Sequence, residues 1–89
     1  MERNILKANT VNYRKGFIEV KGEIHPGCIN IETWEIDANK DITKLSLESK
    51  DIKDEDITAS TEIELSVEDA KKLIYMLEKE IEKQEIKKT

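Results

Sequence analysis

The chain has 89 residues, of which 37% are hydrophobic and 39% charged, and its net charge is −5 at pH 7. This length is too short for two independent cores, so we expect a single domain over residues 1–89, and the periodic placement of 13 isoleucines argues against disorder. One cysteine excludes an internal disulfide, and no apolar run approaches the roughly 18 residues that span a bilayer. We therefore expect a cytoplasmic protein without a membrane partner.

Residues 1–16 place short apolar spots between polar residues and predict a partly flexible start, with or without one short strand. Cations and aromatic residues gather at this end, as they do where a protein contacts nucleic acid: Arg3, Lys7, Tyr13, Arg14, Lys15 and Phe17. A sequence pI near 4.9 is contrary to the usual basic footprint of such proteins. We do not expect direct nucleic-acid binding.

The predicted sheet covers residues 17–65. Residues 17–24 alternate with period two, with Ile18 and Val20 on an apolar face and Glu19 on a polar face. Residues 28–36 form the second strand, in which the apolar parity changes between Ile31 and Trp34. Either a bulge near residues 32–33 brings all the apolar residues to one side, or both faces of this strand are partly covered.

Two further strands are predicted over residues 42–49 and 61–65, joined by the polar loop between them. Short connections between four strands favour an antiparallel meander, because parallel pairing needs a crossover of a dozen or more residues. Residues 37–48 also match four ligand positions of a calcium-binding loop, but Ile42 stands where that loop needs glycine. We interpret this segment as a turn and expect no metal site.

The last predicted element is an amphipathic helix over residues 66–86. Ser66 is the expected N-cap, with Asp69 three residues later as in a capping box. The apolar residues that follow are spaced alternately by three and four positions: Val67, Ala70, Ile74, Leu77 and Ile81. The predicted length suits a helix that lies along one face of the sheet. The fold class that follows is α+β: a small four-stranded antiparallel meander with one C-terminal helix packed on it.

The segment "IHPGCI" holds the only histidine and the only cysteine, His25 and Cys28. A metal site needs three or four ligands, and a Cys/His hydrolase needs an orienting group and an oxyanion pocket as well. Pro26 and Gly27 suit the two central positions of a type II turn. We therefore predict a turn, no catalytic residues, no cofactor and no enzymatic activity.

The charge is concentrated in the middle of the chain, where residues 31–66 carry four positive and eleven negative side chains. Such a patch complements a basic surface, and basic surfaces are typical of nucleic-acid-binding proteins. We expect a non-enzymatic protein-interaction module that binds a larger protein with a basic surface. The expected contact residues are Trp34, Glu48, Asp51, Asp54, Glu55, Asp56 and Glu62.

Ile, Lys and Glu together supply 40 residues, a bias typical of an AT-rich genome, such as that of a low-GC bacterium or its phage. An inhibitor from a phage or mobile element, directed at a nucleic-acid-processing protein, is the form that this bias favours.

The alternative function is an oligomeric protein that sequesters a small molecule in a pocket at the subunit interface. A homodimer is consistent with both functions, because one sheet with one helix leaves a face uncovered. Tyr75 and Met76 are the expected dimer contacts.

Overall fold

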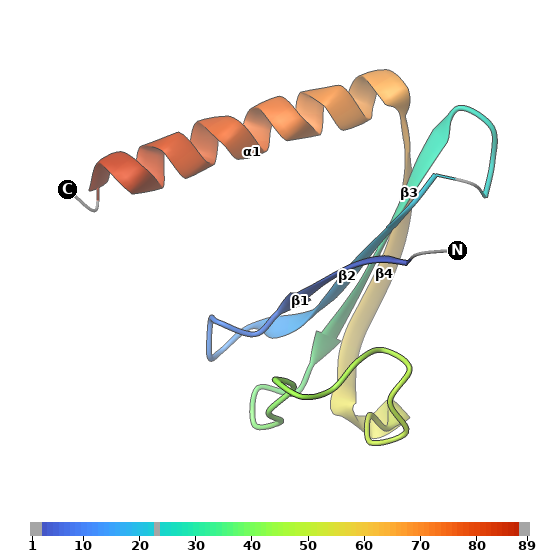
Figure 1. The fold of residues 1–89 in the computed structure, drawn as a ribbon, viewed down its shortest axis with the longest axis vertical. Helices are drawn as coiled ribbons and strands as arrows, with labels where there is room; N and C mark the ends of the chain where they lie inside the picture. Colours follow the sequence, from blue (N-terminus) through green and yellow to red (C-terminus); the bar gives the residue numbers. More distant parts are fainter. Residues whose placement is uncertain (1–2, 23, 88–89) are drawn as a thin grey trace.

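The computed structural model describes residues 3–22 and 24–87, which form a four-stranded antiparallel sheet with one C-terminal helix packing on it (Figure 1). The order of strands in the sheet is their order in the chain, β1-β2-β3-β4. This α+β meander confirms the predicted fold class. Features predicted for residues 1, 2, 23, 88 and 89 lie outside the described residues. The elements are β1 (Asn4–Ala8), β2 (Lys15–Lys21), β3 (Cys28–Ile36), the 3-10 turn η1 (Asp54–Asp56), β4 (Ile57–Ser66) and α1 (Val67–Lys87).

Of the four strands that the sequence predicted, the third in chain order is not found in the structure. The predicted strand over residues 42–49 is wrong, because these residues belong to the connection between β3 and β4. We call this connection, residues 37–56, the lobe. The sheet still has four strands, because β1 is an additional one and pairs antiparallel with β2. It lies in residues 1–16, for which we expected partial flexibility with or without one short strand.

The turn between β2 and β3 has the predicted conformation. The amide N–H of Cys28 donates a hydrogen bond to the carbonyl oxygen of His25, with an N–O distance of 3.2 Å. Gly27 has a φ of +76°, which is the left-handed value that the third residue of a type II turn requires. The type II turn predicted from Pro26 and Gly27 is therefore confirmed.

The sheet has two different faces, and β3 contributes apolar side chains to both. Because side chains alternate along a strand, the paired residues Phe17 and Trp34 share one face, which we call the lobe face. Ile31 and Ile63, which pair across β3 and β4, share the opposite face. The register between β2 and β3 is regular at residues 32–33, so no bulge brings the two sets together. The second alternative, a strand with both faces partly covered, is the observed one.

The core lies on the lobe face and is small. Phe17 and Ile36 from the sheet and Ile42 from the lobe are buried, and Leu45, Leu47 and Ile52 of the lobe are among the partly buried residues packed against them. The lobe thus closes over one end of the sheet (Figure 1). This explains why Ile42 replaces the glycine of a calcium loop, since its side chain is 0% exposed.

The orientation predicted for β2 is wrong. Glu19, expected on the solvent side, has a relative exposure of 1%, whereas Val20 is 36% exposed. Glu19 shares its face with Phe17, and the lobe covers that face. Burial of its charge is tolerated because Arg3 neutralises it, as described below.

The helix α1 starts directly after β4 and extends from the end of the sheet that lies farthest from the lobe (Figure 1). The hydroxyl oxygen of Ser66 accepts a hydrogen bond from the backbone N–H of Asp69 at 3.1 Å, which confirms the predicted N-cap. The helix contacts β4 and β3, but only Ala70 and Leu73 are partly buried among its residues. With no linker after β4, the helix does not lie along the sheet as its length suggested.

Candidate functional site

The lobe is an ordered acidic protrusion that is built by consecutive turns. Backbone N–H groups of Leu45, Ser49 and Ile52 each donate to the carbonyl oxygen three residues earlier. The two ends of the lobe are joined by the N–H of Asp37, which donates to the carbonyl oxygen of Asp56 at 2.7 Å. Because its apolar side chains turn inward onto the core, the charged side chains of the lobe turn outward.

The outward side chains make the lobe negative, with seven acidic residues and four lysines between positions 37 and 56. Asp51, Asp54 and Glu55 are exposed, and within the described residues their carboxylates form no hydrogen bond or ion pair. Asp56 differs, because its carboxylate accepts from the backbone N–H of Lys53 at 3.2 Å and lies 3.6 Å from the Lys40 ammonium. The first three are available to a partner, whereas Asp56 stabilises the turn.

Arg3 connects the lobe to the sheet and was not recognised from the sequence as part of the site. Its guanidinium donates two hydrogen bonds to the carboxylate of Glu19, at 2.8 and 2.9 Å, and a further one to Glu48 of the lobe. The bond from Arg3 lowers the pKa of Glu19 below its ordinary value, against the opposing effect of burial. Both carboxylates raise the pKa of Arg3. Glu48, a predicted partner contact, therefore holds the lobe in place as well.

Three glutamates lie in one row across the lobe face: Glu19 pairs with Glu32, and Glu32 with Glu62. Like charges on directly opposed residues destabilise a sheet unless cations compensate. Lys21 lies between two of them, with its ammonium 3.8 Å from Glu19 and 3.4 Å from Glu32. The amide nitrogen of Asn30 donates to Glu62 at 2.8 Å. These groups are thus engaged with one another by ion pairs and hydrogen bonds.

The sequence placed Trp34 and Glu62 with the acidic contacts, but both lie in the sheet and outside the lobe. Trp34 is partly buried and packs against the core, as a large aromatic residue of a small domain commonly does. Glu62 is exposed on the edge strand β4. Four of the predicted contact residues therefore lie together in the lobe: Asp51, Asp54, Glu55 and Asp56. Glu48 is also in the lobe, but its carboxylate contacts Arg3.

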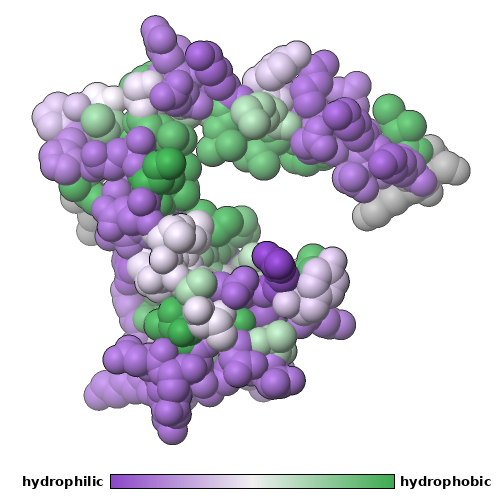
Figure 2. Space-filling view, turned by 180° about the vertical axis from the view of Figure 1, so that it is seen from behind, coloured by the Kyte–Doolittle hydropathy of each residue, from purple (hydrophilic) through white to green (hydrophobic). Residues whose placement is uncertain are grey.

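The helix presents a second open surface. Its apolar residues are largely uncovered: Val67 is 47%, Ile74 56%, Leu77 54% and Ile81 56% exposed. Figure 2 shows this apolar side turned toward an open space between the helix and the sheet. The predicted dimer contacts Tyr75 and Met76 are also exposed, and the ammonium of Lys79 lies 5.4 Å from the centre of the Tyr75 ring.

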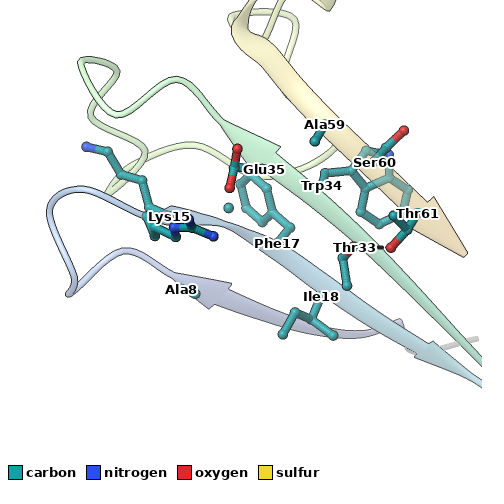
Figure 3. Close-up of a pocket in the computed structure, with 12 residues that line it drawn as sticks. Ala8, Lys15, Phe17, Ile18, Thr33, Trp34, Glu35, Ala59, Ser60 and Thr61 are labelled. Carbon is teal, nitrogen blue, oxygen red and sulfur yellow. Dashed lines mark hydrogen bonds between the residues drawn. The ribbon is translucent and has the colours of Figure 1, made fainter.

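An open hollow of about 300 Å³ lies where residues of β2, β3 and β4 meet (Figure 3). Small residues such as Ala8, Gly16 and Ala59 line it. Gly16 is required there, because a Cβ at this position would lie 1.9 Å from the carbonyl oxygen of Trp34. The volume is at the lower end of the range for ligand pockets, and the hollow is too open to solvent to bury a small molecule by itself.

His25 and Cys28 do not form a site together. The Nδ1 atom of His25 contacts a carboxylate oxygen of Glu64, and Cys28 is a partly buried free thiol. Over residues 3–22 and 24–87, no group of three or more metal-ligating side chains is arranged to hold a metal ion.

No family model matches the chain, and comparison with curated proteins and with solved structures likewise finds no similar protein. In the part of the chain that the structure describes, no helix is both long and apolar enough to cross a lipid bilayer.

Proposed function

We propose that the chain is a non-enzymatic protein-interaction module that binds a larger protein through its acidic lobe. The observation that supports this function is the set of exposed carboxylates on Asp51, Asp54 and Glu55, which have no partner within the described residues. They project from a lobe that packing and hydrogen bonds hold in one shape, so little conformational entropy is lost when they bind. A negative patch of this kind steers and orients a basic partner.

The charge network on the lobe face supports a binding role over a catalytic one. Glu19 is buried against Arg3, and Lys21 is shared between Glu19 and Glu32. Glu19 and Glu32 are thus engaged by Arg3 and Lys21, whereas a general acid or base must reach a substrate. The proposed setting is the cytoplasm. The proposed partner is a nucleic-acid-processing protein whose basic surface the lobe occupies, and an inhibitor from a phage or mobile element is the proposed form.

The test uses two variants with the same change of charge. In D54K/E55K the reversal is on the lobe, and in the control E82K/E85K it is on the exposed face of α1. The wild-type protein first captures its partner from an extract of the source cells, and the purified partner is then titrated with each variant. We expect D54K/E55K to bind at least about tenfold more weakly than the wild type and E82K/E85K to bind within about twofold of it. Equal losses in both variants, or no loss in D54K/E55K, would contradict the role of the lobe.

The second candidate function, an oligomer that sequesters a small molecule, is favoured by the hollow beside Gly16 (Figure 3). A second copy over the hollow would turn it into an enclosed pocket. Binding of an uncharged molecule there would not depend on ionic strength, whereas binding through the lobe would weaken steeply with salt. Native mass spectrometry of the protein purified from its source detects such a molecule directly, as a mass increment on the oligomer.

A further inference from the structure

The uncovered side of α1 has the pattern of a helix that packs against another helix. Val67, Ala70, Ile74, Leu77, Ile81 and Gln84 repeat at alternating spacings of three and four residues, and we call this row the seam. That spacing corresponds to the a and d positions of a heptad. Ile74, Leu77 and Ile81 are more than half exposed, so most of the seam has no partner among residues 3–22 and 24–87 of the same chain. Amphipathic helices of this kind gain stability by covering such a row.

The charged residues beside the seam indicate which partner fits it. The residues that directly follow Ala70, Leu77 and Gln84 occupy equivalent positions on one flank, at intervals of one heptad. They are Lys71, Glu78 and Glu85. The equivalent positions on the other flank are Leu73, Glu80 and Lys87. Charges at these positions select the orientation and register of helix pairs, because they face each other across the contact.

One arrangement of two copies satisfies these charges. When the helices run antiparallel with Ile74 opposite Leu77 of the second copy, Ala70 meets Ile81 and the heptad repeat is in phase along the whole seam. Lys71 then lies beside Glu78 of the second copy, and by symmetry this attraction occurs twice. The small side chain of Ala70 opposite the larger Ile81 also suits close approach of the two helices.

The competing arrangements place like charges together. A shift of the antiparallel register by one heptad in one direction brings Lys71 against Lys71. A shift in the other direction pairs Lys71 with Glu85 but brings Glu78 against Glu78 and Glu80 against Glu80. A parallel pair brings Glu80 against Glu85 of the second copy on both flanks. Like-charge contacts are destabilising by about as much as opposite charges stabilise. Among these arrangements, only the antiparallel register centred on Ile74 and Leu77 places no like charges together across the seam.

We infer that the occupant of the seam is a second copy of this chain, bound as an antiparallel helix pair centred on Ile74 and Leu77. The second helix enters the open space between α1 and the sheet (Figure 2). Its last turns then approach β4, where the side chain of Ile63 is 59% exposed. A helix of 21 residues is about 32 Å long, so the two sheets and their lobes lie at opposite ends of the helix pair.

This dimer differs from the one that the sequence suggested. The helical period of 3.6 residues places Tyr75 and Met76 on the outer side of the helix, away from the seam and from both flanks. The inference is also independent of the proposed function, because no residue of the lobe takes part in the seam. A failure of the lobe variants to affect partner binding would leave it unchanged.

The experiment measures molar mass by sedimentation equilibrium, with variants that the helix tolerates because none of its residues is buried. The chain has a mass of 10.3 kDa, so the wild type is expected at twice that value. L77E places a carboxylate at the centre of the seam and should raise the dissociation constant more than about 100-fold. M76E is the matched control, because Met76 is 60% and Leu77 54% exposed, and it should keep the dimer. A monomeric wild type at about 1 mM, or equal effects of L77E and M76E, would overturn the inference.

Charge exchange tests the register. K71E replaces two attractions by two repulsions and should weaken the dimer by roughly tenfold, since single exposed ion pairs contribute little each. The double variant K71E/E78K restores opposite charges in the antiparallel register and should recover the affinity of the wild type. A double variant that is no tighter than K71E would refute the antiparallel register. Circular dichroism of each variant checks that α1 is retained.

Discussion

Replacement of Ile42 by alanine tests whether the lobe depends on its anchor in the core. Ile42 has 0% exposure and packs with Phe17 and Ile36, although it lies in the lobe, outside the strands and the helix α1. The change removes three carbon atoms from this site, which costs about 2.4 kcal/mol at roughly 0.8 kcal/mol for each buried methylene equivalent. The cavity that remains adds to this, so we expect a loss of about 3 kcal/mol.

The magnitude is large for a chain of this size. At about 0.05–0.15 kcal/mol per residue, the free energy of unfolding of an 89-residue protein is roughly 4–13 kcal/mol. Urea unfolding followed by the fluorescence of Trp34, the only tryptophan, measures the loss. The matched control is I63A, because Ile63 is 59% exposed and the same change there should cost less than about 1 kcal/mol.

A second readout separates the lobe from the sheet. Hydrogen exchange of lobe amides such as those of Leu45 and Ile52 should accelerate in I42A more than exchange of β3, because only packing and short turns hold the lobe. Equal losses of stability in I42A and I63A, or a lobe that exchanges as slowly in I42A as in the wild type, would refute the role of Ile42 as the anchor of the lobe.

Three further changes probe other contacts by urea unfolding. G16A should cost more than about 2 kcal/mol or prevent folding, because its Cβ would lie 1.9 Å from the carbonyl oxygen of Trp34; a stable G16A variant would show that the two strands separate easily. S66A removes the N-cap of α1 and should cost about 1 kcal/mol, with S66D, which restores an acceptor, as its control. Arg3 lowers the pKa of Glu19 in the folded state, so the ionised carboxylate stabilises the fold at pH values above its unfolded-state pKa of about 4.3. This contribution to the free energy of unfolding is lost as the pH falls below that pKa. E19Q should therefore lose less stability than the wild type between pH 5 and pH 3.

The elements that the sequence predicted well are those with local signals. β3 has the predicted bounds because the turn at Pro26 and Gly27 precedes it and a cluster of turn residues follows Ile36. The N-cap at Ser66 and the seam predicted the start and the amphipathic character of α1. In each case, the residues that decide the structure are within a few positions of one another in the chain.

The errors concern contacts between distant segments. Alternation of Thr43, Leu45 and Leu47 imitates a strand, but in the lobe the two leucines reach the core from a series of turns. Glu19 looked solvent-exposed because periodicity alone does not show which face the lobe covers. Its partner Arg3 is 16 residues away, and no local pattern connects the two. The identical parity of Phe17 and Glu19 was the signal that could have indicated this face.

Of the candidate site, the sequence predicted the exposure of the acidic residues but not which of them are engaged within the protein. The acidic stretch around Asp54 and Glu55 is exposed as expected, since a run of charged residues has no apolar side chain to bury. The sequence could not distinguish Asp56, whose carboxylate stabilises η1, from its two neighbours. It also did not reveal that α1 leaves its seam open, because the direction of the helix depends on the absence of a linker after β4.

The most direct test of the proposed function is the association rate constant of the purified partner at low and high ionic strength. If the lobe steers the encounter, the rate for the wild type should fall by roughly tenfold or more between about 20 and 300 mM salt, because the Debye length shortens over this range. D54K/E55K should associate slowly at both concentrations. A wild-type rate that is independent of salt, or a D54K/E55K rate equal to that of the wild type, would contradict an interaction through the acidic lobe.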